Sequence, residues 1–458
     1  MEEGQFHHAL KVMEDLCTAC SHCMRTCPTE AIRIRGGKAM ISDNKCVDCG
    51  QCYKVCPSNA IYVEQDDFNI IYNYKYRIAI VPAILIGQFP ENINTEEIYS
   101  TLIDLGFTHV YEVENSVDLL NDFMTEYHLE NQENKPHISC FCPAIVRLIQ
   151  VKYPSLTNHL IPMKQPVDLS AKYFKKKLTD QGIPSNEIGI FYITPCAAKI
   201  AAVKSPVGED VSIITGVINM DLIYNRILRH LKNNKKDSNQ KIIERDHLTA
   251  KGITWPLTEG EAKNMQGRTV AIDGIENVAE FLERLENDEI TGFDFLELRA
   301  CDQSCAGGIL TSWNRFLTVE RLKKRAQLYN SDEKKKAKGK DISNFRGFLH
   351  ANKAIDTILP RNISILDKDT ERAISKMKKV HKTLCNLPGF DCGVCGAPSC
   401  QALAEDIAHG DSQISHCLFL QKVMEKNKKL TAEHAYTIIE DIWGENRISK
   451  NYNKKGVK

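Results

Sequence analysis

Residues 17–28 read CTACSHCMRTCP, and residues 46–57 read CVDCGQCYKVCP. Both stretches follow the pattern C-x2-C-x2-C-x3-C-P, and each is followed by a short apolar run, at residues 31–34 and 60–63. The proline after each fourth cysteine turns the chain away from the cysteine loop. The N-terminal region is therefore an internal repeat of one cysteine loop and one short strand.

This cysteine spacing is typical of [4Fe–4S] ligation, in which three close thiolates bind one cluster and the fourth binds the cluster of the other repeat. We expect one cluster on Cys17, Cys20, Cys23 and Cys56 and a second on Cys46, Cys49, Cys52 and Cys27. Two zinc sites are the alternative, but zinc sites use pairs of C-x2-C rather than quadruplets ending in C-P. Neither predicted cluster has an open coordination position, so we expect the repeat to relay electrons.

Composition limits the class of protein. The chain has 458 residues, with 59 basic and 59 acidic side chains, so length predicts several domains and charge gives no bulk attraction for nucleic acid. No signal peptide and no apolar run of about 20 residues is visible, and we therefore expect a cytoplasmic protein without a membrane span. Thiols stay reduced in that compartment, so the 18 cysteines are expected to be metal ligands rather than disulfides.

Apolar runs alternate with helical patterns through the middle of the chain. The expected buried strands lie at 76–86, 187–194 and 269–272. The expected helices lie at 95–105, 144–152, 216–232 and 276–286. This alternation predicts an α/β domain with largely parallel sheets. We expect three domains, with a lysine-rich connector at 330–345: a small α+β two-cluster domain (1–70), the central α/β domain (71–365) and a small helical cluster-binding domain (366–458).

Five more cysteines lie in three short segments of the central region, beside proline or paired glycines at expected strand ends. The segments read SCFCP at 139–143, TPCAAK at 194–199 and ACDQSCAGG at 300–308. Taken singly, each cysteine could be a buried structural residue. Together, four thiolates from three distant loops form a candidate site for one further cluster.

The three segments, in this order behind a two-cluster repeat, resemble the large subunit of [FeFe]-hydrogenases over about residues 1–365. In that family they bind the H-cluster, a [4Fe–4S] cubane joined through one shared cysteine to a diiron site that carries CO, cyanide and a bridging dithiolate. The resemblance implies Cys142, Cys196, Cys301 and Cys305 as ligands, with Cys305 as the shared thiolate.

The resemblance also assigns residues around the diiron site. Lys199 matches the family lysine that donates a hydrogen bond to one cyanide, a reasonable partner for an anionic acceptor in a dry pocket. Pro82 and Ala83 match the segment near the other cyanide. Gln165 lies in the stretch MKQP, which resembles a Lys-Ser-Pro segment of the family.

Several positions depart from the family pattern, and they concern proton transfer. Active members place a second cysteine directly before the first-motif ligand, whereas this chain has Phe141, which cannot carry a proton. Cys140 lies one residue earlier and could approach if the loop is re-registered. The serine after the family lysine is Gln165, and residues 118–126 offer only loosely aligned acids in place of the relay glutamates. The third motif has Arg299 where a methionine is usual.

A last group of cysteines has the spacing C-x2-C-x4-C-x16-C and comprises Cys392, Cys395, Cys400 and Cys417. It resembles the [4Fe–4S] domain of corrinoid iron–sulfur proteins, and a zinc site is the alternative. Residues 402–409 look like a helix closed by Gly410, and residues 421–458 look helical and basic.

We therefore expect an [FeFe]-hydrogenase-like enzyme with two N-terminal and one C-terminal [4Fe–4S] clusters plus an H-cluster. It would bind or reversibly oxidise H2 with low turnover, as in the sensory or regulatory branch of the family. The alternative is a non-catalytic electron-transfer or redox-sensing scaffold that lacks the diiron site. A cluster-assembly factor is a third reading, against which the C-terminal cluster domain argues.

The expected partners are inferred in part from motifs that are not found in the sequence. No glycine-rich nucleotide motif follows a strand, and no signalling output domain is identified. H2 and protons would be the small-molecule partners, and a redox or signalling protein would act in trans. We expect no nucleic-acid partner, and a homodimer is compatible with the sequence.

Overall fold

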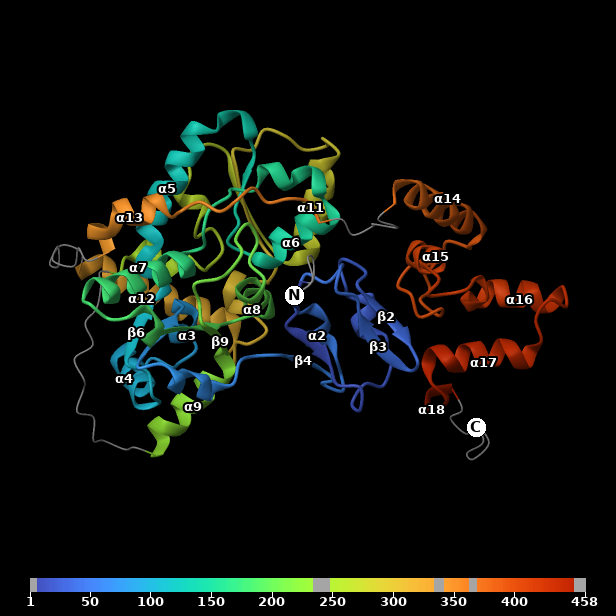
Figure 1. Ribbon diagram of the computed structural model, residues 1–458, viewed down its shortest axis with the longest axis horizontal. Coiled ribbons are helices and arrows are strands. Elements are labelled where there is room, and N and C mark those ends of the chain that lie inside the picture. The colour runs from blue at the N-terminus through green and yellow to red at the C-terminus, as the bar shows by residue number, and fades with distance from the viewer. Residues whose placement is uncertain (1–5, 234–247, 333–341, 362–368, 449–458) are drawn as a thin grey trace. The chain divides into compact units, whose positions relative to one another are not determined.

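The computed structural model describes residues 6–233, 248–332, 342–361 and 369–448 (Figure 1). The chain forms two compact units, one made of residues 1–46, 50–63 and 361–458 and the other of 47–49 and 64–360. The first and last cysteine-rich regions therefore share one unit, although they are far apart in the sequence. Within the described residues, no helix is long and apolar enough to cross a membrane.

The N-terminal part of the first unit consists of two antiparallel strand pairs and two short helices. β1 pairs with β4 and β2 with β3, the strands being β1 (Leu10–Val12), β2 (Ile32–Arg35), β3 (Lys38–Ile41) and β4 (Ile61–Val63). The helices α1 (His22–Arg25) and α2 (Gln51–Val55) each contain the third cysteine of one repeat. The strands predicted after each cysteine loop are confirmed to within a residue.

The C-terminal part of the first unit is helical, as expected. Its helices are α14 (Thr370–Asn386), α15 (Cys400–His409), α16 (Leu418–Lys426), α17 (Ala432–Trp443) and α18 (Glu445–Ile448). Ser399 caps the start of α15, and the helix ends at Gly410, whose φ of 95° suits glycine. The predicted helix and its stop are confirmed, and residues 449–458 lie outside the described part of the chain.

The β2–β3 hairpin joins these two parts of the first unit through its backbone. Ile34 N–H donates to Gly396 O at 2.8 Å, and Gly36 and Gly37 N–H donate to the carbonyls of Asp441 and Ile442, both at 3.0 Å. In Figure 1 this hairpin lies beside α15 and α17. Backbone hydrogen bonds require a short distance and a good angle between the two groups, so they fix the position of the helical part against the β2–β3 hairpin.

The second unit is built around two parallel sheets, which confirms the predicted α/β class. The first has the order β6-β5-β8-β9 and consists of β5 (Tyr76–Val81), β6 (His109–Glu112), β8 (Ile188–Thr194) and β9 (Gly216–Asn219). The second has the order β10-β11-β7 and consists of β7 (His137–Ile138), β10 (Thr269–Asp273) and β11 (Phe295–Arg299). The strands of the first sheet are almost entirely buried, as parallel sheets covered on both faces require.

Helices connect the strands and cover the sheets (Figure 1). They are α3 (Ala83–Gly87), α4 (Thr95–Asp104), α5 (Val117–Glu130), α6 (Pro143–Lys152), α7 (Pro166–Asp180), α8 (Ala197–Lys204), α9 (Met220–Asn233), α10 (Ala250–Thr254), α11 (Ile275–Glu286), α12 (Arg315–Asp332) and α13 (Arg346–Ala351). α6 and α7 each begin with a proline, whose missing N–H costs nothing at that position. The helices predicted at 95–105, 144–152 and 276–286 are confirmed.

Two predicted elements of this unit are wrong in part. The strand predicted over 76–86 ends at Val81, because Pro82 cannot donate to a sheet and instead caps α3. The helix predicted over 216–232 begins only at Met220, because residues 216–219 pair with β8 as a buried strand. The connector expected at 330–345 falls mostly in residues 333–341, outside the described residues.

The two sheets explain why distant sequence motifs can meet. Each cysteine motif follows the carboxyl end of a strand: β7 precedes Cys140, β8 precedes Cys196 and β11 precedes Cys301. Parallel strands present their carboxyl ends at one edge, where open α/β sheets bind ligands.

Candidate functional site

Two of the three central motifs place a cysteine directly before a helix. Cys142 is the N-cap of α6 and Cys196 is the N-cap of α8, with extended backbone at both positions. Partial positive charge at a helix N-terminus favours a thiolate there. The third motif follows β11 as a tight loop in which Ser304 N–H donates to Cys301 O at 3.0 Å.

Three of the four predicted H-cluster thiols converge on one lysine. Lys199 Nζ lies 3.7 Å from Cys305 Sγ, and the lysine also interacts electrostatically with Cys196 and Cys142. Burial raises the pKa of Cys196 to about 12 and also raises that of Cys142. Burial alone would lower the pKa of Lys199, but the nearby thiols raise it above its ordinary value. The fourth residue, Cys301, is half-buried four positions before Cys305.

Phe141 lies between two cations at this site. Its ring centroid is 4.2 Å from Lys199 Nζ and 4.1 Å from Arg299 Cζ, and Trp255 meets it edge-on at 6.4 Å. The ring is 8% exposed. Desolvated cation–π contacts contribute about 2 kcal/mol each, so Phe141 fixes both cations beside the cysteines.

Arg299 belongs to a buried charge cluster. Its Nη2 pairs with Glu261 at 2.5 Å and its Nε lies 3.6 Å from Glu297, and all three side chains are at most 2% exposed. Two carboxylates raise the pKa of this guanidinium although burial opposes charge, so it remains a cation. Within the described residues, its buried Nη1 has no hydrogen-bond partner. A buried donor without a partner is costly, which indicates that a bound group would accept from it.

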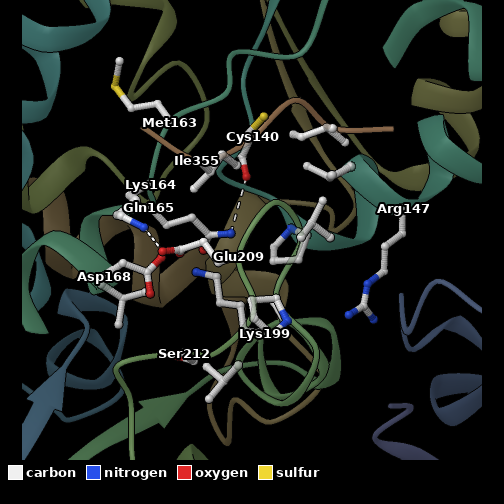
Figure 2. Close-up of a pocket in the computed structure, with 18 of the residues that line it drawn as sticks. Cys140, Arg147, Met163, Lys164, Gln165, Asp168, Lys199, Glu209, Ser212 and Ile355 are labelled. Carbon is white, nitrogen blue, oxygen red and sulfur yellow. Dashed lines mark hydrogen bonds and ion pairs between the residues drawn. The ribbon is translucent and has the colours of Figure 1, made fainter. Parts of the chain in front are cut away.

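The remaining predicted residues line cavities beside this cluster. One of them, of about 710 Å³ including its open side, is bordered by Cys140, Gln165 and Lys199, and Figure 2 shows these side chains around it. Gln165 Nε2 reaches Cys140 O at 3.5 Å, and Lys164 forms an ion pair with Glu209.

A narrow cavity adjoins the large one. It is lined by Pro82, Phe141, Gln165, Lys199 and Cys305, together with Glu114 and Tyr192. Ala83, the first residue of α3, is not among the lining residues, but its backbone N–H donates to Glu114 Oε2 at 2.9 Å.

The N-terminal repeat shows the same local geometry in its two halves. Ala31 N–H donates to Cys27 Sγ and Ala60 N–H donates to Cys56 Sγ, both at 3.2 Å. Backbone N–H groups aimed at sulfur stabilise thiolate ligands. In addition, burial and the neighbouring thiols of Cys20, Cys17 and Cys56 raise the pKa of Cys23 to about 12. These four thiols are therefore close enough to interact, including the one that comes from the other repeat.

The C-terminal cysteines are grouped less completely. Burial, together with the thiols of Cys392 and Cys417, raises the pKa of Cys395 to about 11, so these three sulfur atoms are close together. Cys400 is the first residue of α15, and its backbone N–H donates to Asp391 at 2.6 Å. Arg35 of the N-terminal repeat donates to Cys395 O at 3.1 Å.

The central residues fit the cofactor that the resemblance implies. Cys142, Cys196 and Cys305 would supply thiolate ligands of a cubane from three loops, and Cys301 would supply the fourth. Lys199 and Arg299 would supply buried positive charge for an anionic group. Within the described residues, the Nη1 group of Arg299 has no hydrogen-bond acceptor, so it is available to donate to such a group. The narrow cavity beside Cys305 is the place for a group attached to that thiolate.

Three charged residues of the site were missed by sequence reasoning. Glu114, Glu261 and Glu297 are each at most 3% exposed. Glu297 and Arg299 could have been found, because charged residues inside an apolar strand must be paired when the strand is buried. Glu261 lies in a loop whose sequence has no distinguishing pattern.

Comparisons with known proteins were made for the whole chain. Residues 75–218 match the family model for the iron only hydrogenase large subunit, C-terminal domain. Residues 9–66 match a 4Fe-4S dicluster domain, and residues 387–419 match a domain described as a putative Fe-S cluster. A search of curated proteins finds no match.

Solved structures of [FeFe]-hydrogenases are also similar to the chain. One, described as revealing stepwise H-cluster assembly, has 15% identity and a TM-score of 0.48, over 62% of this chain and 94% of that chain. A variant of the enzyme from Chlamydomonas reinhardtii gives the same values, and another variant gives 14% and 0.47. By its family matches, this chain carries a region, residues 75–218, that is similar to the iron-only hydrogenase large subunit, and two further regions that are similar to iron–sulfur cluster domains.

Proposed function

We propose that the chain binds H2 and oxidises it reversibly at low turnover, and that electrons pass through its iron–sulfur clusters. The observation that carries the proposal is the convergence of Cys142, Cys196 and Cys305 on the buried Lys199. Buried charges in proteins are paired, and the groups gathered around this lysine are thiols, which bind iron as thiolates. We assign the H-cluster to these cysteines and Cys301.

The chain's own residues would act on the bound group in three ways. The diiron group, when bound, supplies the open metal position at which H2 reacts. Lys199 and Arg299 would donate charge-assisted hydrogen bonds to the anionic ligands of that group. Phe141 would hold both cations in place beside the cavity, but its ring cannot transfer a proton. Loss of a general acid–base group typically costs about 10² to 10⁴ in rate, which is why we propose low turnover and a sensory role.

Contacts within the first unit support electron transfer between the C-terminal cluster and the first N-terminal one. Met24 follows Cys23, and Gly393 follows Cys392; a Cβ at Gly393 would come within 3.0 Å of Met24 Cε. The two proposed cluster-binding loops therefore touch. Arg33 and Arg35 both pair with Asp406 of α15, at 2.8 and 2.7 Å, and hold the loops in this position.

Infrared spectroscopy of the protein matured with the diiron cofactor tests the proposal. We expect CO and cyanide stretching bands in the wild type and their loss in Cys305→Ala, because the shared thiolate is removed. Cys385→Ala is the matched control, since Cys385 is exposed on α14 and is left out of every proposed ligand set. Absence of these bands in the wild type, with cubane signals alone in electron paramagnetic resonance, would favour the non-catalytic scaffold.

A further inference from the structure

A buried carboxyl group lies in the narrow cavity that also contains Lys199 and Cys305. It belongs to Glu114, which lies in the 3-10 turn Val113–Ser116 just after β6. The residue is 3% exposed. Strand β6 adjoins β5, whose carboxyl end leads into Pro82 and Ala83. Glu114 therefore reaches the site from the same sheet edge as these two residues.

The surroundings of Glu114 hold it in place and make it easy to protonate. Ala83 N–H donates to its Oε2 at 2.9 Å. Burial, reinforced by the charge of Glu112, raises the pKa of Glu114 to about 8. Glu112 itself is paired with Arg325 at 2.5 and 2.9 Å, and Tyr99 also donates to it. Arg325 and Tyr99 therefore hold the Glu112 carboxyl group in place near Glu114.

The other polar groups in the narrow cavity are poorly suited to carry a proton at neutral pH. Lys199 faces Cys305 Sγ at 3.7 Å, and its ammonium group is a donor with no acceptor atom. Burial raises the pKa of Tyr192, which therefore keeps its proton. Gln165 has no titratable group, and Cys305 is the proposed shared ligand. Glu114 is the one carboxyl group among the residues that line this cavity.

We propose that Glu114 is the proton-exchanging residue of this site and that it takes the role left open by Phe141. This inference rests on the proposed function. Oxidation of one H2 releases two protons and two electrons, and the electrons leave through the iron–sulfur clusters. The Glu114 carboxylate accepts one proton at a time, an O–H bond forms on the carboxyl group, and the proton then leaves to solvent. In the reverse direction the carboxylic acid donates.

The first test uses the protein without the diiron cofactor and therefore does not depend on H2 chemistry. Infrared difference spectra recorded across pH 6 to 10 should show a protonated carboxyl band that disappears around the value of about 8 given for Glu114. Glu114→Gln should remove this band, and Glu130→Gln should leave it. Glu130 is a fair control because it is an exposed acid at the end of α5 and is not among the residues that line the narrow cavity.

The second test measures exchange between H2 and D2O by the matured protein, which requires a proton acceptor but no electron partner. Glu114→Gln should lower the exchange rate by about 10² or more, with the CO and cyanide bands retained, while Glu130→Gln should exchange like the wild type. Unchanged exchange in Glu114→Gln would overturn the inference, as would a carboxyl band that survives this substitution. Absence of exchange in a wild type that shows the CO and cyanide bands would instead refute H2 activation, and the carboxyl titration would still decide the protonation of Glu114.

Discussion

Replacement of Phe141 by cysteine is the most informative single change at the site. It would restore a thiol directly before Cys142, where active members of the family carry one. The substitution also removes a ring that is 8% exposed and lies 4.2 Å from Lys199 Nζ and 4.1 Å from Arg299 Cζ. Catalysis and stability should therefore change in opposite directions.

The size of the gain in rate and of the loss in stability can both be estimated. A restored acid–base group should raise the H2 evolution rate by about 10² to 10⁴. Deletion of a buried phenylalanine typically costs about 3 to 5 kcal/mol. The loss of two buried cation–π contacts adds to this, each contributing about 2 kcal/mol. We therefore expect Phe141→Cys to be faster and clearly less stable than the wild type.

Phe141→Ala is the matched control, because it opens the same space without adding a thiol. H2 evolution from a reduced viologen dye by matured proteins gives the rates, and thermal unfolding of the unloaded proteins gives the stability. A rate in Phe141→Cys that exceeds that of Phe141→Ala by about tenfold or more would support the reasoning, because one acid–base group typically contributes at least that much. Equal rates in the two variants would refute it.

Three further predictions concern stability and electron transfer. Arg325→Met should lower the free energy of unfolding of the second unit, measured by urea titration, by about 3 to 5 kcal/mol, because it leaves the Glu112 carboxylate buried without a cationic partner. Arg284→Met is the control: it breaks an exposed ion pair and should cost less than about 1 kcal/mol in the same measurement. The pKa of Glu114 is higher in the folded state than in the unfolded chain, so the protonated carboxyl group stabilises the fold at low pH. This contribution to the free energy of unfolding should fall as pH rises from 4.5 to about 8, by up to about 1.4 kcal/mol per pH unit. A wild-type pH dependence identical to that of Glu114→Gln would contradict this prediction. Asp406→Asn should leave the iron content unchanged but slow electron transfer between the C-terminal and N-terminal clusters, because two arginines of β2 lose their ion partner. Freeze-quench paramagnetic resonance measures the transfer rate. An unchanged rate would contradict the role of Asp406 in holding the two cluster-binding loops together.

Much of the fold could be predicted because local chemistry determines it. The cysteine repeat predicted the strands at 31–34 and 60–63, and apolar periodicity predicted most strands and helices of the central unit. The errors occurred where one residue overrides an apolar run. Pro82 ends β5 because it lacks an N–H group, and residues 216–219 form a strand because β8 offers a partner that sequence periodicity cannot reveal.

The association of the first and last cysteine regions in one unit could not be predicted. It depends on backbone hydrogen bonds from the β2–β3 hairpin to Gly396, Asp441 and Ile442, and backbone atoms have no sequence signature. The candidate site could be predicted only in part, and the reason is similar. Spacing identifies thiolates, whereas the approach of Glu114 and Glu261 to the cysteines depends on the sheet edge and on a loop.

The most direct test of H2 oxidation is whether H2 alone reduces the clusters of the matured protein. Oxidised protein is placed under H2 or under argon, and reduced [4Fe–4S] clusters are followed by paramagnetic resonance over time. We predict slow reduction under H2, none under argon, and none in Cys305→Ala under H2. Oxidised clusters that persist under H2 in protein with intact CO and cyanide bands would contradict the account.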